Sequence, residues 1–497
     1  MIPLFHGKRV HLLGIGGAGV SALVPLLKAL GASVSGCDTA DSATTRRLRA
    51  NGVPVAIDHD AAHVHAVDIV VHTAAITPDH PELQAARARG VRVLGRGECL
   101  IELMAGARTL AVSGSHGKTT TTWFAGHLLT VANADPVVMV GGSVGSLGGG
   151  ARAGRGPLFV AEVDESDGSF AGVRPTVAIV TNLDREHLRH YGSFAALEQA
   201  FNTWLRSVPA NGLVIVPTSG LSEHVTTGVT AQLVRVGLDR GDCHATALEL
   251  GAEGSRCRMV LHGQDLGELS VPIPGAHMVA NALMAVVATR FLHPATALAA
   301  LASCERVRRR FLVHGTTAGI RVVEDYGHHP VEVRATIAAA RLAGGRVHVL
   351  FQPHRHTRTQ DCMDDFISAF DQAHSVALLP IYGAGEPPIA GVSSEILASA
   401  LSARRAVESS FDKAEAEAEA EAEAEAEAEA VSQTVLATSD RDDALRFLAK
   451  QAAAGDTVLV LGAGDVGDCA PRLSSFFAHG RRKPATIIHA EAAHVFA

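Results

Sequence analysis

The sequence predicts an α/β protein of three domains, in which the first and last are Rossmann-like and the middle one is built on a parallel sheet. Short apolar runs, each long enough for one buried strand, alternate with longer segments of helical pattern along most of the chain. Glycine-rich turns directly follow several of these runs, as they do at strand ends that bind ligands. With 497 residues, the chain is also too long for a single hydrophobic core.

The composition supports globular folding and argues against a nucleic-acid partner. Hydrophobic residues make up 47% of the chain and aromatic residues only 4%, so aliphatic side chains must fill the cores. The formal charge of -8 comes from one segment, since eight glutamates alternate with alanine between Lys413 and Val431. We interpret this acidic run, residues 413–431, as a solvated insertion without a functional role, because strict alternation leaves no apolar stripe that could dock. The sequence has no basic patch of the kind that binds nucleic acid.

Cysteine usage and hydropathy indicate the compartment. The seven cysteines are scattered without a C-x-x-C pair, which favours a reducing cytosol over a disulfide framework. The N-terminus lacks the apolar stretch of a signal peptide, and no uncharged apolar segment reaches about 18 residues. We therefore expect a cytoplasmic protein without membrane insertion, present as a monomer or a homodimer.

Residues 1–107 are predicted to form the first domain. Expected strands are 10–13, 33–37 and 68–71, and expected helices are 21–30 and 81–89. The first strand leads into Gly14-Ile-Gly16-Gly17-Ala-Gly19, and Asp38 follows about 20 residues later, which is the spacing of a dinucleotide-binding turn. This pattern alone allows two interpretations. The protein is either an NAD-dependent oxidoreductase or a protein that holds another diphosphate, such as that of a nucleotide sugar.

Residues 108–312 are predicted to form the second domain, of the P-loop ATPase type. An apolar strand at 110–112 precedes a candidate phosphate loop made of Gly114, Ser115, His116, Gly117, Lys118, Thr119 and Thr120. Backbone N–H groups of such a loop bind phosphate oxygens, Lys118 supplies a charge for the β- and γ-phosphates, and Thr119 can ligate Mg²⁺. The glycines stand closer together than in the usual P-loop pattern, so an ordinary glycine turn is the alternative. An oxidoreductase would leave Lys118 without a role.

Two segments rich in acids and histidine follow later strands of the same domain. EVDESD, residues 162–167, comes after the strand expected from residue 158, and NLDREH, residues 182–187, follows the strand expected at 177–181. Carboxylate and imidazole groups at such strand ends can hold divalent ions against nucleotide phosphates. Each segment alone resembles a solvated loop, but behind a nucleotide loop both become candidate metal ligands.

Residues 313–497 are predicted to form the third domain. Expected strands are 321–324, 346–351, 376–380 and 457–461, with a helix at 330–341. Polar segments follow the first two strands and contain Tyr326, His328, His329, His354, Arg355 and Arg358. We disfavour a zinc site, because the adjacent His328 and His329 cannot easily aim both rings at one ion. Arg355 and Arg358 better fit a carboxylate clamp, since guanidinium binds carboxylate in a bidentate manner.

Taken in order, these motifs resemble those of the Mur ligase family from His11 to about Gly467. The matching segments are HLLGIGGAGVS, SGSHGKTTTT, EVDESDGSF, TNLDREHLRHYG, PGAHMVANAL, RRRF, EDYGHHP, FQPHRHTRT, IYGAGE and LGAGDVG. The resemblance implies an ATP-dependent ligase of peptidoglycan biosynthesis that activates the carboxylate of UDP-N-acetylmuramate as an acyl phosphate and joins it to L-alanine. The alternative within the family is a recycling ligase that attaches a stem peptide instead.

The resemblance also implies a role for each candidate residue. The UDP substrate would be bound by Gly14, Gly16, Gly17, Gly19, Asp38 and Thr73. ATP would be bound by residues 114–120 together with His277, Asn281 and Arg310. Mg²⁺, or Mn²⁺ in its place, would be held by Thr119, Glu162 and His187. The amino acid and the activated carboxylate would lie near Tyr326, His354, Arg355 and Arg358, and the catalytic set would be Lys118, His187, Arg310, His328 and His354.

The sequence departs from the family pattern at three single positions and one pair. Met278 stands where Asn is usual, Glu324 where Asp is usual and His356 where Tyr is usual. Residues 73–74, Thr-Ala, replace a serine-rich pair. None of these changes removes a candidate phosphate or metal ligand. We therefore expect an active enzyme rather than a degenerate nucleotide-binding regulator.

Overall fold

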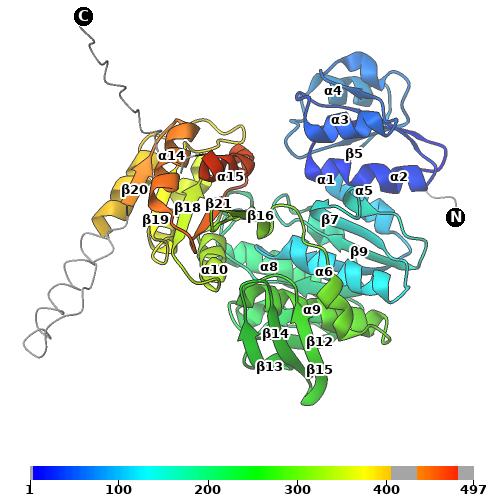
Figure 1. Ribbon diagram of the computed structural model, residues 1–497. Helices are drawn as coiled ribbons and strands as arrows, with labels where there is room; N and C mark the ends of the chain where they lie inside the picture. Colours follow the sequence, from blue (N-terminus) through cyan, green and yellow to red (C-terminus); the bar gives the residue numbers. More distant parts are fainter. Residues whose placement is uncertain (1–3, 405–433, 480–497) are drawn as a thin grey trace, which may run out of the picture. The chain divides into compact units, whose positions relative to one another are not determined.

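The computed structural model describes residues 4–404 and 434–479, which form three sheets with helices packed against them (Figure 1). The chain divides into two compact units, Met1–Arg310 and Phe311–Ala497. The first unit carries two sheets and the second carries one, so the predicted three-domain α/β fold is confirmed. The acidic run at 413–431 lies outside the described residues.

The first sheet has the order β3-β2-β1-β4-β5, and all its pairs are parallel. Its strands are β1 (Arg9–Leu13), β2 (Ser33–Cys37), β3 (Val55–Ala56), β4 (Ile69–His72) and β5 (Arg92–Gly95), and its helices are α1 (Ala18–Ser21), α2 (Leu23–Ala29), α3 (Ala43–Ala50), α4 (Pro81–Ala88) and α5 (Arg96–Met104). The predicted helix at 21–30 is replaced by two helices, α1 and α2. Pro25 is tolerated because it lies in the first turn of α2, where its missing N–H breaks no helical hydrogen bond.

The second sheet has ten strands in the order β15-β14-β13-β12-β11-β10-β6-β9-β7-β8. Its strands are β6 (Arg108–Ser113), β7 (Val137–Val144), β8 (Gly149–Arg152), β9 (Leu158–Glu162), β10 (Val177–Val180), β11 (Leu213–Pro217), β12 (Gln232–Val236), β13 (Cys243–Leu250), β14 (Ser255–Leu261) and β15 (Gln264–Val271). The centre is parallel as predicted, whereas β14, β15 and β8 add antiparallel edges. Sequence analysis missed β14 because its buried and exposed side chains alternate, which leaves no continuous apolar run.

Three loops of the central domain lie at one edge of its sheet, next to the helices of that domain. The helices are α6 (Lys118–Val131), α7 (Leu188–Tyr191), α8 (Phe194–Leu205) and α9 (Ala276–Leu292). Helix α9 starts at Ala276, because Gly275 with a φ of 110° turns the chain directly into the helix. Strands β9, β6 and β10 are neighbours, so the loops after their carboxyl ends lie together, which is where ligands bind parallel sheets.

The third sheet has the order β16-β17-β21-β18-β19-β20, and within it only β16 is antiparallel to its neighbour. Its strands are β16 (Leu312–Thr317), β17 (Ile320–Asp325), β18 (Val347–Phe351), β19 (Ser375–Leu378), β20 (Thr434–Ala437) and β21 (Thr457–Leu461). Its helices include α10 (Pro330–Arg341), α11 (His356–Asp361), α12 (Met363–Ala369), α14 (Arg441–Gln451) and α15 (Cys469–His479). Because β17, β21 and β18 are parallel neighbours, the polar segments after β17 and β18 emerge at the same edge.

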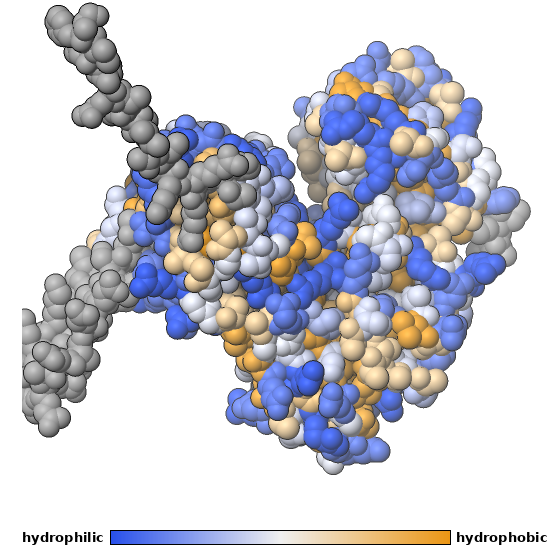
Figure 2. Space-filling model, in the orientation of Figure 1, coloured by the Kyte–Doolittle hydropathy of each residue, from blue (hydrophilic) through white to orange (hydrophobic). Residues whose placement is uncertain are grey.

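The surface and the cysteines agree with a globular protein. On the face shown in Figure 2, hydrophilic and hydrophobic residues are interspersed. Within residues 4–404 and 434–479, no helix is both long and apolar enough to cross a membrane. All seven cysteines are buried free thiols.

Candidate active site

The candidate phosphate loop joins β6 to α6 through two glycines with positive φ. Gly114 has a φ of 124° and Gly117 a φ of 80°, both of which favour glycine. Space is limited as well, because a methyl group added at Gly114 would lie 2.4 Å from Thr181 Oγ1, and one at Gly117 would lie 2.8 Å from Asn281 Oδ1. The glycines therefore form a tight turn at the amino end of α6, where free N–H groups and the helix dipole favour an anion.

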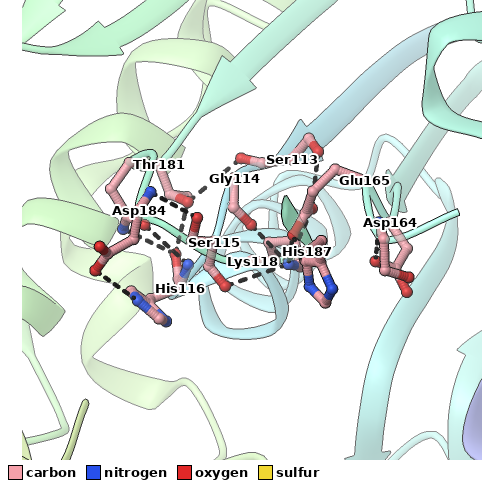
Figure 3. Close-up of polar contacts among 12 residues, drawn as sticks. Ser113, Gly114, Ser115, His116, Lys118, Asp164, Glu165, Thr181, Asp184 and His187 are labelled. Atoms are coloured by element: carbon pink, nitrogen blue, oxygen red, sulfur yellow. Dashed lines mark hydrogen bonds and ion pairs between the residues drawn. The ribbon is translucent and has the colours of Figure 1, made fainter. Parts of the chain in front are cut away.

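The segment after β10 holds this loop in place (Figure 3). Asn182 Oδ1 accepts a hydrogen bond from His116 N at 2.9 Å, and Asn182 Nδ2 donates to His116 O at 3.0 Å. The Thr181 hydroxyl donates to the same carbonyl oxygen at 2.6 Å. Asp184 N donates to Ser115 Oγ at 2.8 Å. The loop is thus fixed by side chains before any nucleotide arrives.

Lys118, the predicted phosphate-binding cation, forms a buried ion pair with Glu165. Its Nζ donates to the two Glu165 carboxylate oxygens at 2.8 and 3.0 Å and to the carbonyl oxygens of Gly114 at 2.6 Å and Ser115 at 3.3 Å. The Ser113 hydroxyl donates to Glu165 Oε2 at 3.3 Å. The Glu165 side chain is only 1% exposed, so each charge depends on the other for compensation.

The electrostatics keep Lys118 charged and make Glu165 a weak acid. Burial lowers the pKa of Lys118, but the carboxylates of Glu165, Asp164 and Glu162 raise it by a larger amount. The pKa of Lys118 therefore lies above its ordinary value. Burial raises the pKa of Glu165 to about 7, although the nearby Lys118 ammonium opposes this shift. The site therefore presents a permanent positive charge beside the phosphate loop.

His187, predicted as both a metal ligand and a catalytic residue, lies next to this ion pair. It has a φ of 58° and places its Nε2 3.7 Å from Glu165 Oε1. The Tyr191 hydroxyl donates to the main-chain carbonyl oxygen of Glu165 at 2.5 Å. Figure 3 shows Lys118, Glu165 and His187 gathered beside the loop. Three strand ends, those of β6, β9 and β10, thus contribute to one polar site.

The other predicted metal ligands, Thr119 and Glu162, lie against β7. Gly141 N donates to Glu162 Oε2 at 2.7 Å, and a methyl group at Gly141 would lie 2.4 Å from Glu162 Oε1. A methyl group at the neighbouring Gly142 would lie 3.1 Å from Thr119 Cγ2. Hydroxyl, carboxylate and imidazole groups are ligands that Mg²⁺ and Mn²⁺ accept. The donor set around the loop therefore fits a divalent cation of this class.

The predicted ATP-binding residues His277 and Asn281 lie at the start of α9. Asn281 is 7% exposed and faces Gly117, so it reaches the phosphate loop itself. His277 is the second residue of the helix and is partly exposed. Met278, the departure from the family pattern, is 5% exposed and belongs to the apolar interior. This burial gives the methionine a packing role that does not depend on the nucleotide.

Arg310 ends the first compact unit and is partly exposed. The segment before it is fixed to β7, because Arg308 N donates to Ser143 O at 2.8 Å and Glu305 Oε2 accepts from Ser146 N at 2.9 Å. Strand β7 is also the strand against which Glu162 lies. The backbone thus brings Arg310 to the β7 side of the phosphate loop.

The N-terminal glycine loop, Asp38 and Thr73, which were predicted to bind the UDP substrate, lie together. A methyl group at Gly14 would lie 2.7 Å from Thr73 Cγ2. Asp38 Oδ2 accepts a hydrogen bond from Gly16 N at 2.8 Å, and Asp38 Oδ1 accepts one from Ala40 N at 3.2 Å. In a dinucleotide site this carboxylate would bind the ribose, whereas here it bonds to the loop's own backbone.

Arg96, which was not among the predicted residues, connects the glycine loop with the central domain. It is the first residue of α5, and a methyl group at Gly19 would lie 2.9 Å from Arg96 Cδ. Arg96 Nη2 lies 3.7 Å from Asp164 Oδ2. Burial raises the pKa of Asp164, but the positive charges of Lys118 and Arg96 lower it by a larger amount. The pKa of Asp164 therefore lies below its ordinary value. The EVDESD motif signalled Asp164, but no motif signalled Arg96.

In the second compact unit, four predicted residues form one cluster. His328 Nδ1 lies 3.0 Å from Tyr326 O and 3.3 Å from Glu332 Oε2. The ring centroids of His328 and Tyr326 are 5.3 Å apart, and those of His328 and His354 are 5.6 Å apart. Arg358 Nη1 lies 3.3 Å from His354 Nδ1. The ends of β17 and β18 therefore supply a shared polar site.

Arg355, predicted as part of a carboxylate clamp, contacts Glu386. Its side chain is 50% exposed, and its Nη1 lies 3.5 Å from Glu386 Oε1. Glu386 also accepts from Thr357 N at 3.0 Å and from the Thr357 hydroxyl at 2.9 Å. Tyr382 stacks on His354 with centroids 5.7 Å apart and an interplanar angle of 9°. Tyr382 and Glu386 belong to the IYGAGE segment, whose motif was noticed without a role being assigned to either residue.

Sequence comparison matches nearly the whole chain to one family. Residues 9–108 match the Mur ligase family, catalytic domain, residues 112–289 match the Mur ligase middle domain, and residues 309–464 match the Mur ligase, glutamate ligase domain. The UDP-N-acetylmuramate–L-alanine ligase of Sorangium cellulosum is 41% identical over 94% of this chain and 96% of its own length. The enzyme of the same name from Symbiobacterium thermophilum is 41% identical over 95% of both chains.

Solved structures give the same fold. The UDP-N-acetylmuramate-alanine ligase MurC of Thermotoga maritima aligns with a TM-score of 0.75 and 26% identity over 95% of this chain and all of its own. A MurF ligase of Thermotoga maritima, solved in complex with ADP, aligns with a TM-score of 0.57 and 13% identity over 96% of this chain and 99% of its own. The second likeness concerns the fold alone.

Proposed function

The chain belongs to the Mur ligase family, and we propose that it joins L-alanine to the carboxylate of UDP-N-acetylmuramate with conversion of ATP to ADP and phosphate. The observation that carries this proposal is the 41% identity, over 94% of the chain, with a ligase of that name. The phosphate loop with Lys118 supports it, because formation of an acyl phosphate requires a site for the γ-phosphate.

We propose that each domain holds one substrate. Residues 1–107 would bind UDP-N-acetylmuramate through the loop braced by Asp38, residues 108–312 would bind ATP, and residues 313–497 would bind L-alanine near His328 and His354. The nucleotide substrates and the seven free thiols support a cytoplasmic location. A recycling ligase that attaches a stem peptide is not favoured, since the two relatives above both carry the alanine name.

The chemistry explains why the site is built around Lys118. A carboxylate is a poor electrophile, so its oxygen first attacks the γ-phosphorus and forms an acyl phosphate while ADP leaves. The neutral amine of L-alanine then attacks the acyl carbon, and phosphate departs. Negative charge is spread over the transferring phosphoryl oxygens, and Lys118 is the fixed cation of the loop. To bind phosphate, Lys118 exchanges part of its contact with Glu165 for the new oxygens.

Thr119, Glu162 and His187 would hold the divalent cation of the reaction. A bound Mg²⁺ would neutralise charge on the phosphates and orient them. Independently of the ion, the hydrogen bond from Gly141 N holds Glu162 in position, and the clasp around His116 holds the loop. Amine attack also needs a proton acceptor near the amino acid, for which His328 and His354 are the histidines of the third-domain cluster.

Phosphate release tests the proposal. The purified chain is incubated with ATP, Mg²⁺ and UDP-N-acetylmuramate, and either L-alanine or a stem tripeptide is added in parallel. We expect release that depends on L-alanine. Release only with tripeptide would assign the protein to the recycling branch, and release with neither would overturn the proposal. Lys118→Met serves as the inactive control.

A further inference from the structure

A second cluster of metal-ligating side chains lies in the N-terminal domain, apart from the phosphate loop. His11 comes from β1, Cys37 from the end of β2, His63 from the 3-10 helix Ala61–Val64, and Glu82 from the first turn of α4. One ligand atom from each of these four residues lies within 4.8 Å of the other three. His11, Cys37 and Glu82 are 3%, 0% and 0% exposed, so the cluster is interior.

Hydrogen bonding accounts for much of this cluster. Glu82 Oε1 lies 3.0 Å from Asp60 N, 3.1 Å from His59 Nδ1 and 3.3 Å from His63 Nδ1. The Cys37 thiol donates to Glu82 Oε2 at 3.3 Å. These contacts satisfy the buried carboxylate and form a network that a structural role alone would explain.

His11 is the exception. Its Nδ1 is 2.9 Å from Ser35 Oγ, which fixes the ring, while its Nε2 is buried and has no hydrogen-bond partner among the described residues. The Nε2 lies 3.7 Å from Glu82 Oε2, too far for a hydrogen bond. A buried polar atom without a partner is destabilising, and this one faces a thiol and a carboxylate. A ring held through one nitrogen with the other aimed at anionic ligands is the arrangement of a metal-binding histidine.

We propose that His11, Cys37, His63 and Glu82 form a binding site for one zinc-like divalent cation. Two imidazoles, one thiolate and one carboxylate are ligands that Zn²⁺ takes in a tetrahedral set. A thiolate selects against Mg²⁺, which prefers oxygen, so this site differs in chemistry from the ligands around Lys118. The two anionic ligands balance the charge of the cation, and the Cys37 proton leaves when the metal binds. Ligand atoms within 4.8 Å of one another need only small side-chain shifts to share one ion.

The site would also stabilise the glycine loop. Cys37 is followed directly by Asp38, whose carboxylate accepts the hydrogen bond from Gly16 N. A metal on Cys37 would therefore fix the strand end that braces the loop. This consequence for UDP-N-acetylmuramate binding rests on the proposed function, whereas metal binding itself does not.

Cobalt titration of the full chain tests the metal site. Co²⁺ replaces Zn²⁺ in tetrahedral sites, and a thiolate ligand gives it a charge-transfer band in the near ultraviolet. The variants are Cys37→Ala, His63→Ala and, as the matched control, Cys99→Ala, which removes another fully buried thiol of the same domain. Co²⁺ bound at Thr119, Glu162 and His187 would give no such band, because those residues offer no sulfur. The readout is thus separate from ligase activity.

We expect the wild type and Cys99→Ala to develop the band at one equivalent of Co²⁺, to lose it on adding Zn²⁺, and to melt at higher temperature with Zn²⁺. Cys37→Ala should lack the band. The His63 side chain is 21% exposed, so His63→Ala should leave the fold intact. This variant should weaken Co²⁺ binding at least about tenfold. Absence of the band in the wild type, its survival in Cys37→Ala, or unchanged affinity in His63→Ala would each overturn the proposal.

Discussion

The pair of Lys118 and Glu165 gives the sharpest stability prediction. Lys118→Met keeps the length of the side chain but removes the ammonium, which leaves Glu165, 1% exposed, with the Ser113 hydroxyl at 3.3 Å as its remaining close side-chain donor. Breaking a buried pair by removing one partner costs about 3–5 kcal/mol. The pKa of Glu165 is already about 7, so its carboxylate can take up a proton when Lys118 is removed. At a pH slightly above neutral we therefore expect a loss of stability at the lower end of this range, about 3 kcal/mol.

The double variant Lys118→Met/Glu165→Gln separates this loss of pairing from a general packing defect. It leaves no unpaired charge, so most of the lost stability, about 1.5 kcal/mol or more, should return. Activity should be absent in both variants, since the phosphate-binding cation is missing in each. The double variant would therefore be stable but inactive.

Urea unfolding followed by tryptophan fluorescence measures this effect in the correct domain. The chain has two tryptophans, Trp123 on α6 and Trp204 on α8, and both are buried in the central domain. The signal therefore reports unfolding around the phosphate loop. If the single and double variants lose equal stability, the uncompensated charge of Glu165 is not what destabilises Lys118→Met, and the reasoning fails.

Three further predictions follow from single positions. Gly141→Ala should change the free energy of unfolding by no more than about 0.5 kcal/mol, because the added methyl group meets only the end of the flexible Glu162 side chain. It should displace Glu162 and so raise the Mg²⁺ concentration required for phosphate release about tenfold. An unchanged Mg²⁺ requirement would remove Glu162 from the metal site. Gly117→Ala should destabilise the chain by about 1–2 kcal/mol in urea because its φ is 80°, and an unaltered unfolding midpoint would contradict the strained turn. Burial lowers the pKa of His348, which is 0% exposed, so the unfolded state binds the extra proton and stability should fall as pH drops below about 6.5. His348→Gln should flatten that decline in denaturation followed by circular dichroism, and an identical pH profile would rule out this contribution.

The sequence predicted the elements that have strong local signals. Apolar runs marked β2 and β21 at their observed bounds, and the glycines of 114–117 marked the loop, because both signals arise within a few residues. The antiparallel strands at one edge of the central sheet were missed, since half-exposed strands lack an apolar run. The domain boundaries near residues 107 and 312 remain predictions.

Long-range contacts within the site were the part that could not be predicted. The sequence of EVDESD does not tell which of its carboxylates turns inward. The contact between Glu165 and Lys118 is determined by the fold. Arg96 lacks a motif because its partner Asp164 is distant in the sequence. Tyr382 reaches His354 only through the pairing of their backbones beyond β18. Each of these contacts depends on which strands become neighbours, and short-range patterns do not encode that order.

An oxygen-transfer measurement tests the central claim most directly. UDP-N-acetylmuramate labelled with oxygen-18 in its carboxylate is incubated with the chain, ATP, Mg²⁺ and L-alanine, and the released phosphate is analysed by mass spectrometry. Ligation through an acyl phosphate predicts that each phosphate carries one labelled oxygen and that the product contains L-alanine in amide linkage. Unlabelled phosphate, or labelled phosphate without the L-alanine product, would contradict the account.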